Sequence, residues 1–171
     1  MPVPRDLYRR ISGSFPTGVV IVATLDAEGR PRGLLTQAYL GLSTEPPLML
    51  IALDATSRTL PALRQHGAFV LNFLRAGSED LATLFASKSD EKFRDVRWSP
   101  SPEARGAPII RDACVAYAAC NVTQTIEAGD HWLFVGSVEA GEAFGGTPLM
   151  YYRRRYAPWP EERLAPPIEE A

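Results

Sequence analysis

The sequence predicts a mainly β domain, in which antiparallel strands close into a barrel and three short helices are inserted between them. Six or seven segments are rich in β-branched and apolar residues, as strands are. Several of these segments are separated only by a short turn, which is typical of hairpin neighbours. The segments do not follow the regular alternation of strand and helix that builds a parallel sheet, so a closed antiparallel barrel is favoured over a doubly wound sheet.

The N-terminal part of the chain predicts a helix followed by a hairpin and a buried strand. Leu7, Ile11 and Phe15 recur at a spacing of four, which predicts an amphipathic helix that Asp6 can cap and Pro16 ends. Further on, an almost wholly apolar run predicts a strand covered on both faces. The expected elements are a helix over 6–15, strands over 17–25, 31–35 and 48–53, and a turn over 26–29.

The rest of the chain predicts two more helices and four more strands. Ser57 and Ser78 stand where these helices would begin, and Gly67 stands where the first of them would end. Cys114 and Cys120 fall on one predicted strand, about 20 Å apart between Cα atoms, which is too far for a disulfide. Their equal parity places both on one face, where core packing is expected. The expected elements are helices over 57–66 and from 78, a loop over 88–111, and strands over 68–74, 113–127, 132–140 and 149–156.

Composition and charge argue against several classes of protein. The 171 residues suit one domain over 1–156, followed by a Pro- and Glu-rich tail over 157–171 that is either disordered or laid over a partner. The formal net charge of −2 gives no field that favours nucleic acid or an anionic membrane. No segment approaches the about 18 apolar residues of a spanning helix, and no signal region follows the N-terminus, so a cytoplasmic protein is expected. The two histidines and two distant cysteines do not form the usual ligand pattern of a metal site.

Four stretches are candidates for binding or catalysis. Ser57-Arg58-Thr59 combines two hydroxyls, a guanidinium and the N–H groups of a helix start, which suit phosphate, although a plain helix cap uses the same residue types. Lys88 to Phe93 carries two lysines and an aromatic ring, and by itself it is typical of a solvated loop. His131 follows a turn and either serves a site or bonds to local backbone. Tyr151 and Tyr152 face opposite sides of a strand, so one can line a pocket while the other packs.

Read together and in order, these stretches resemble the flavin reductase-like family, the small reductase components of two-component flavin monooxygenases. Each segment is weak alone, but the combination, which covers roughly residues 6–156, is specific. The segments that carry the resemblance are Phe15-Pro16-Thr17-Gly18-Val19, Gly33 to Ser43 with Glu45-Pro46-Pro47-Leu48, Ser57-Arg58-Thr59-Leu60, Phe69-Val70-Leu71-Asn72, Lys88 to Phe93, Gly106-Ala107-Pro108, Glu127-Ala128-Gly129-Asp130-His131, and Leu149-Met150-Tyr151-Tyr152-Arg153.

The resemblance implies a split β-barrel homodimer with FMN or FAD at the subunit interface, reduced by NADH or NADPH for an oxygenase partner. It implies that the stretch containing Thr36, Gln37 and Ala38 lies along the isoalloxazine ring. It further implies that His131 faces the nicotinamide as the catalytic residue. The remaining implied contacts are Ser57, Arg58 and Thr59 on the phosphate, Lys88, Lys92 and Phe93 over the flavin tail, and Tyr152 or Arg153 completing the pocket.

The ring stretch departs from the family pattern, which often reads Gly-x-Thr-Ala-Asn-Ser-Phe-x-Ser-x-Ser. This chain has Leu35 for the first hydroxyl, Gln37 for the asparagine, Ala38 for the serine and Gly41 for the second serine. Side-chain partners of the ring are therefore lost or altered. Backbone groups hold the ring instead, or flavin binds loosely as a passing substrate, or the pocket is repurposed. The alternatives to a reductase are a flavoenzyme that keeps its flavin and acts on an organic substrate, and a non-catalytic flavin-binding module.

Overall fold

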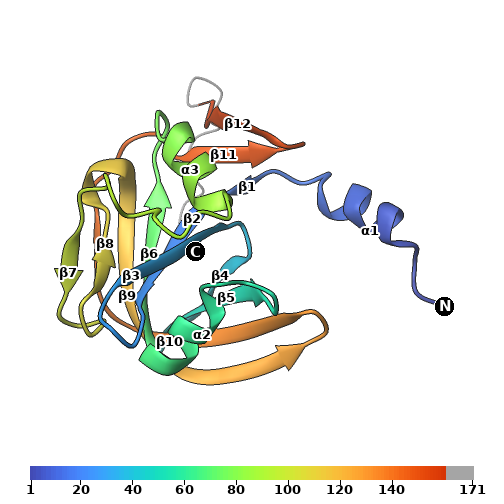
Figure 1. Cartoon of the computed structure of the whole chain (residues 1–171). Helices are drawn as coiled ribbons and strands as arrows, with labels where there is room; N and C mark the ends of the chain where they lie inside the picture. Colours follow the sequence, from blue (N-terminus) through green and yellow to red (C-terminus); the bar gives the residue numbers. More distant parts are fainter. Residues whose placement is uncertain (161–171) are drawn as a thin grey trace.

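A seven-stranded antiparallel sheet dominates the computed structural model, which describes residues 1–160 (Figure 1). Its strand order is β3–β2–β6–β9–β10–β5–β4. The predicted class, a mainly β antiparallel barrel, is confirmed, because the neighbouring strands in this order are antiparallel. The strands are Pro31–Thr36 (β3), Val20–Leu25 (β2), Ala68–Leu74 (β6), Cys114–Ala128 (β9), His131–Ala143 (β10), Pro47–Asp54 (β5) and Tyr39–Thr44 (β4).

In the described part of the chain, two small sheets accompany the large one. They join Thr17–Gly18 (β1) with Leu149–Tyr152 (β11) and Arg155–Pro158 (β12), and Ser99–Ser101 (β7) with Ala107–Ile109 (β8). The single strand predicted over 149–156 is therefore wrong, because the chain reverses between β11 and β12. Arg153 and Arg154 make this reversal with φ angles of 47° and 63°. Such left-handed positions usually hold Asn or Gly, so the sequence carries no turn signal here. Most of the predicted tail over 157–171 lies outside the described residues.

Within residues 1–160, three α-helices and one 3₁₀ turn accompany the strands. They are Arg5–Ser12 (α1), Leu60–His66 (α2), Glu79–Ala86 (α3) and the turn Arg111–Ala113. Gly67 ends α2 with a left-handed φ of 68°, as the sequence predicted. The predicted start at Ser57 is wrong, because two turns precede the helix: the Ser57 N–H donates to the Asp54 carbonyl oxygen and the Leu60 N–H to that of Ser57. Ser78 precedes α3 without a capping side-chain bond; its hydroxyl donates to the Ala113 carbonyl oxygen.

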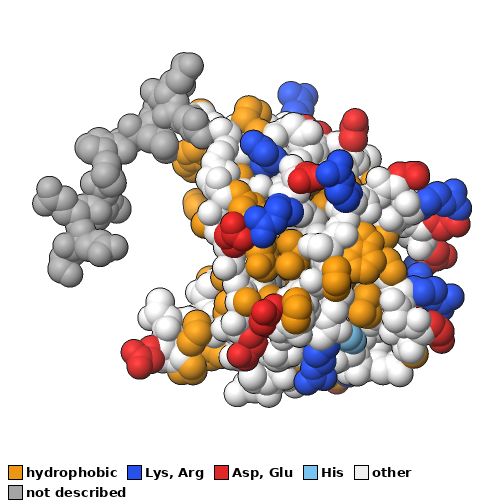
Figure 2. Space-filling model, turned by 90° about the vertical axis from the view of Figure 1, so that its left-hand side faces the viewer, with side chains coloured by type: hydrophobic (Ala, Val, Ile, Leu, Met, Phe, Trp, Pro, Cys, Tyr) orange, Lys and Arg blue, Asp and Glu red, His pale blue; other side chains and the backbone are white. Residues whose placement is uncertain are grey.

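The core is divided by the sheet, because successive residues of a strand point to opposite faces. Val20 and Val22 of β2 pack inside the barrel against Phe69 and Phe134. The alternate residues of β2 pack outside, under α3, in a second cluster that includes Phe85. A third cluster lies beneath β7 and β8. On the face seen in Figure 2, apolar side chains gather in the middle and charged side chains surround them.

The cysteines do not share a face as predicted. Cys120 lies in the cluster inside the barrel, whereas Cys114 lies in the cluster under α3. The cause is a register shift in β9: Phe73 pairs with Ala116 but Leu74 pairs with Cys114, so one residue is inserted as a bulge and the parity changes. Both thiols are buried and free, and burial raises the pKa of each to about 12.

Apolar side chains expected in the core are partly exposed. In α1 no residue is buried, and Leu7, Ile11 and Phe15 are 37%, 59% and 77% exposed. Figure 1 shows α1 standing off the barrel. Asp6 lies in the first turn rather than at the cap, which is Pro4. The predicted strand over 48–53 is present, but its burial on both faces is wrong for the single chain, since only Ile51 and Leu53 are buried. No described helix is long and apolar enough to cross a membrane.

Candidate functional site

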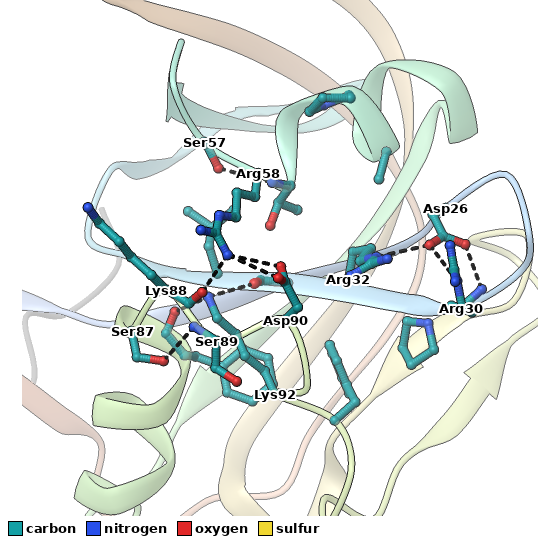
Figure 3. Close-up of a pocket in the computed structure, with 18 of the residues that line it drawn as sticks. Asp26, Arg30, Arg32, Ser57, Arg58, Ser87, Lys88, Ser89, Asp90 and Lys92 are labelled. Atoms are coloured by element: carbon teal, nitrogen blue, oxygen red, sulfur yellow. Dashed lines mark hydrogen bonds and ion pairs between the residues drawn. The ribbon is translucent and has the colours of Figure 1, made fainter.

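A pocket of about 1060 Å³ opens beside β3 (Figure 3). Its walls come from the β2–β3 hairpin, from the segment around the start of α2, and from the end of α3 with the loop that follows. The fold brings six of the sequence-predicted site residues to this pocket, although two separate segments supply them. They are Ser57, Arg58, Thr59, Lys88, Lys92 and Phe93.

Arg58 joins two walls of the pocket. Its Nη1 donates to the carbonyl oxygen of Lys88 at 2.6 Å and lies 3.1 Å from each carboxylate oxygen of Asp90. Both charged side chains of this pair are about two-thirds exposed, at 62% and 66%. Exposed ion pairs contribute at most about 1 kcal/mol, so a stronger anion in the pocket can displace Asp90 from the guanidinium.

Hydroxyl groups lie on either side of Arg58. The Thr59 N–H donates to the Ser57 Oγ at 3.3 Å, and this hydroxyl keeps its own hydrogen to donate elsewhere. Thr59 itself is buried and stands at the cap position of α2 without a side-chain capping bond. Because α2 begins only at Leu60, Ser57 and Arg58 precede the helix, and their side chains add donors to this end of the pocket.

Lys92 fixes the loop after α3 against β3. Its Nζ donates to the carbonyl oxygen of Phe85 at 2.8 Å and to that of Gly33 at 3.2 Å. Burial, reinforced by the nearby Arg58, lowers the pKa of Lys92, while Asp90 opposes this effect. Gly33 of β3 is closely packed, because a Cβ at this position would lie 2.9 Å from the Val22 carbonyl oxygen. Lys92 therefore shapes the pocket floor.

Phe93 is nearly buried, with 8% of its surface exposed, although it borders the pocket. Its ring meets Phe85 edge to face with centroids 4.9 Å apart. Lys88, by contrast, is exposed, and its ammonium makes no ion pair with any residue of 1–160. The loop thus presents one anchored and one free cation to the pocket.

A carboxylate organises the opposite end of the pocket. Asp26 Oδ2 accepts from the Nε of Arg30 at 3.0 Å and from the Nε of Arg32 at 2.9 Å, while Oδ1 accepts the N–H groups of Glu28 and Arg30. Burial opposes the charge, since the Asp26 side chain is only 12% exposed. The bonds from Arg30 and Arg32 outweigh burial and lower the pKa of Asp26 from 3.8 to about 2.

Thr36, Gln37 and Ala38, implied to lie along the flavin ring, stand at the end of β3 and just after it, and they do not line this pocket. Thr36 ends the strand, and its Oγ1 accepts from the Ala38 N–H at 3.0 Å. The Gln37 Oε1 accepts from the Thr17 hydroxyl at 2.9 Å. Much of the hydrogen-bonding capacity of this stretch is thus used within the chain.

His131, Tyr152 and Arg153 also lie outside the pocket lining. His131 begins β10, opposite Asp54 of β5, which does line the pocket, so the histidine is one strand away. Its Nδ1 lies 2.7 Å from Asp130 Oδ1. Tyr152 and Arg153 belong to the β11–β12 hairpin, where the guanidinium stacks over the tyrosine ring at 5.1 Å. One chain does not bring these three residues to the pocket.

Sequence reasoning missed two acidic residues that pair with arginines in the pocket, and it missed the pair of arginines that Asp26 holds. Asp26, Arg30 and Arg32 belong to a segment interpreted only as a turn and a return strand. The available signal was the equal parity of Arg30 and Arg32, which on a strand places both side chains on one side. Asp90 carried no local signal, because its partner Arg58 is 32 residues away.

The donor set suits a phosphorylated ligand with a flat apolar part. Arg58, Lys88 and the Ser57 hydroxyl supply charge-assisted bonds of the kind that phosphate accepts. Leu34 and Leu35 of β3 supply apolar wall next to these cations. Ligand pockets combine an apolar lining with a few polar groups in this manner, and they commonly enclose about 300–1,000 Å³.

Comparisons with known proteins agree with this geometry. The model of the family described as flavin reductase like domain matches residues 12–160. The flavin reductase (NADH) of Kitasatospora aureofaciens is 43% identical over 162 residues, which are 94% of this chain and 84% of that protein. The reductase subunit HsaB of a flavin-dependent monooxygenase from Rhodococcus jostii is 33% identical over 160 residues, 93% of this chain and 80% of that protein. The structure of nitrilotriacetate monooxygenase component B from Mycobacterium thermoresistibile superposes with a TM-score of 0.89 at 32% identity, covering 97% of this chain and 92% of that one.

Proposed function

Since the chain belongs to the flavin reductase-like family, it is an NAD(P)H-dependent flavin oxidoreductase, and we propose that it reduces exchangeable FMN or FAD at N5 for release to an oxygenase component. The nicotinamide supplies a hydride and the flavin ring accepts it, so the cofactors carry the reactivity. The protein has to hold the two rings in contact with the donor carbon over N5. The cations gathered along one pocket support this proposal most directly.

The phosphate of the flavin is assigned to the end of the pocket that holds Arg58. The guanidinium, the Ser57 hydroxyl and the free ammonium of Lys88 supply the donors. Lys92, which is bound to two carbonyl oxygens, keeps the loop in place beneath them. Arg58 would exchange its bond to the exposed carboxylate of Asp90 for one to the phosphate.

The ring is assigned to the stretch after β3, where backbone groups provide the polar contacts. Thr36 and Gln37 already use side-chain oxygens within the chain. A ring edge that gains few side-chain partners is held weakly, because each unpaired polar group costs about 1–3 kcal/mol on burial. Weak holding favours a flavin that enters and leaves as a substrate over one that stays bound.

His131 is assigned to the nicotinamide side. It stands at the start of β10, beside the pocket-lining Asp54, with its Nδ1 near Asp130. An imidazole oriented by a carboxylate can hold a carboxamide or pyrophosphate with its other nitrogen. In this role it positions the donor and transfers no proton.

Steady-state oxidation of NADH, followed at increasing FMN or FAD, tests the proposed function. A rate that rises with added flavin and saturates is the expected result, together with purified protein that carries little flavin. Tightly bound flavin with slow NADH turnover would instead support a flavoenzyme acting on an organic substrate. Flavin binding without turnover of NADH or NADPH would leave a binding module and refute the reductase.

A further inference from the structure

The first helix, α1, carries an apolar face that is largely uncovered within residues 1–160. Leu7, Tyr8 and Ile11 lie on one side of the helix, at spacings of three and four, and Tyr8 is 62% exposed. Isolated helices shorter than about 12–15 residues are marginal in water, because few hydrogen bonds offset the cost of nucleation. An eight-residue helix with no buried residue therefore needs another surface to pack on.

An apolar groove of about 510 Å³ lies at the point from which α1 extends. Gly18 forms part of its wall, and only residues 13–16 separate α1 from the strand that begins at Thr17. Several of the lining side chains are only partly buried, so the groove offers apolar surface to a partner as α1 does. Its apolar lining includes Val19, Tyr39, Met49, Phe73, Val115 and Val138.

The charges of α1 and of the groove are opposite in sign. α1 carries three arginines and one aspartate. Glu142 lies in the wall of the groove, where it pairs with Arg111 at 2.7 Å, and the exposed Glu139 of the same strand makes no ion pair with any residue of 1–160. The segment 161–171 holds four glutamates and one arginine. A basic helix therefore matches this groove better than the acidic end of the chain does.

The segment between α1 and the groove directs the helix away from its own barrel. Pro16 has a fixed φ, and Phe15, as the residue before a proline, is restricted to extended backbone. In Figure 1, α1 stands off the barrel. Because α1 extends from the edge of the groove, a twofold axis beside this edge brings each helix to the groove of the other copy, so both contacts form in one closed dimer.

We propose that α1 is an exchanged arm: it packs its apolar face into this groove of a second copy, whose own α1 packs into the groove of the first. The family resemblance implies a homodimer but assigns neither α1 nor the groove to the contact. The inference does not depend on flavin reduction, since the groove shares no lining residue with the pocket beside β3.

Sedimentation equilibrium of the full chain with flavin present tests the contact through two variants. Ile11→Glu places a charge on the apolar face of α1, and Ala143→Trp fills the groove from an exposed position in its wall. A symmetric dimer contains the contact twice, so each variant should raise the dimer dissociation constant about a hundredfold or more. Leu84→Glu is the matched control: it changes an exposed leucine of α3 outside the groove and should alter the constant less than about twofold.

Cross-linking between two kinds of chain identifies the copy that α1 contacts. Chains with Ile11→Cys and chains with Ala143→Cys, produced together with tags of different size, are treated with a short bismaleimide. Cys114 and Cys120 are buried, so they should not react. A covalent product with one chain of each kind is expected, because only a contact between copies can form it. Leu84→Cys in place of Ala143→Cys should abolish this product.

Several results would overturn the proposal. A wild-type monomer at micromolar concentration would leave no second copy to receive α1. A dimer that Ile11→Glu does not weaken would place α1 outside the contact, and a lowered Tm with an unchanged dimer would place it on its own barrel. A dimer that Ile11→Glu weakens without any mixed cross-linked product would assign α1 to another surface of the second copy. The cross-linking result decides the question even if Ala143→Trp fails to fold.

Discussion

Replacing Arg58 by alanine tests the phosphate end of the pocket. The side chain donates to the Lys88 carbonyl oxygen and to Asp90, and its pair with Asp90 is largely exposed. Such a pair contributes at most about 1 kcal/mol to the free energy of unfolding. A charge-assisted bond to phosphate contributes about 1.5–3 kcal/mol, and giving up Asp90 subtracts part of it. Arg58→Ala should therefore weaken flavin binding about tenfold and change the free energy of unfolding by less than about 1 kcal/mol.

Asp90→Asn is the matched control, because it removes the competing carboxylate and keeps the guanidinium. Flavin affinity should rise by up to about fivefold in this variant, since the energy of an exposed pair is no longer lost on binding. The two changes thus have opposite signs in a fluorescence titration, although each breaks the same ion pair. Urea denaturation of both variants checks that stability changes little.

Two results would refute this reasoning. If both variants weaken flavin binding to a similar extent, the ion pair acts by ordering the loop after α3, and Arg58 does not hold the phosphate. If Arg58→Ala binds flavin as the wild type does, the phosphate lies elsewhere in the pocket. Each result is visible in the affinities alone, without measurement of turnover.

Three further predictions concern other parts of the molecule. His131→Ala should raise the KM for NAD(P)H roughly two- to tenfold, as loss of one hydrogen bond would, with flavin affinity unchanged; normal kinetics with a lower Tm would place His131 outside the site. Lys92→Met leaves the carbonyl oxygens of Gly33 and Phe85 without their donor and should lower the free energy of unfolding by about 1–3 kcal/mol in urea, whereas an unchanged value would mean that they find other partners. Sedimentation at micromolar concentration with flavin should show a homodimer, since α1 buries no residue in the single chain; a monomer would count against it.

The elements that local chemistry specifies were predictable from the sequence. The β2–β3 hairpin is one case, because Asp26 accepts the N–H groups of Glu28 and Arg30 and Gly29 adopts a positive φ of 73°. The end of α2 at Gly67 is another. In both places the residue that forms the turn is also the one that signals it, so no distant contact is needed.

Features that depend on distant parts of the chain were not predictable. The bulge that separates Cys114 from Cys120 arises where β9 pairs with β6, and nothing between the two cysteines marks it. The reversal at Arg153 and Arg154 places two arginines in left-handed conformations, so the pattern of a continuous strand was misleading. The exposure of α1 has a similar origin, since an apolar stripe predicts burial without saying which surface covers it.

Some of the predicted site residues meet in one pocket of the single chain, and others do not. Ser57, Arg58 and the lysines after α3 meet in one pocket of one chain, because the barrel places α2 and the loop after α3 on either side of β3. His131 and Tyr152 do not reach that pocket, and no rearrangement of loops is needed to explain this. The resemblance assigns flavin to a subunit interface, where a second copy would supply part of the lining. Residues that different protomers contribute to such a site lie apart in a single chain, so their separation here is compatible with the proposed homodimer, and a monomer in sedimentation would count against both.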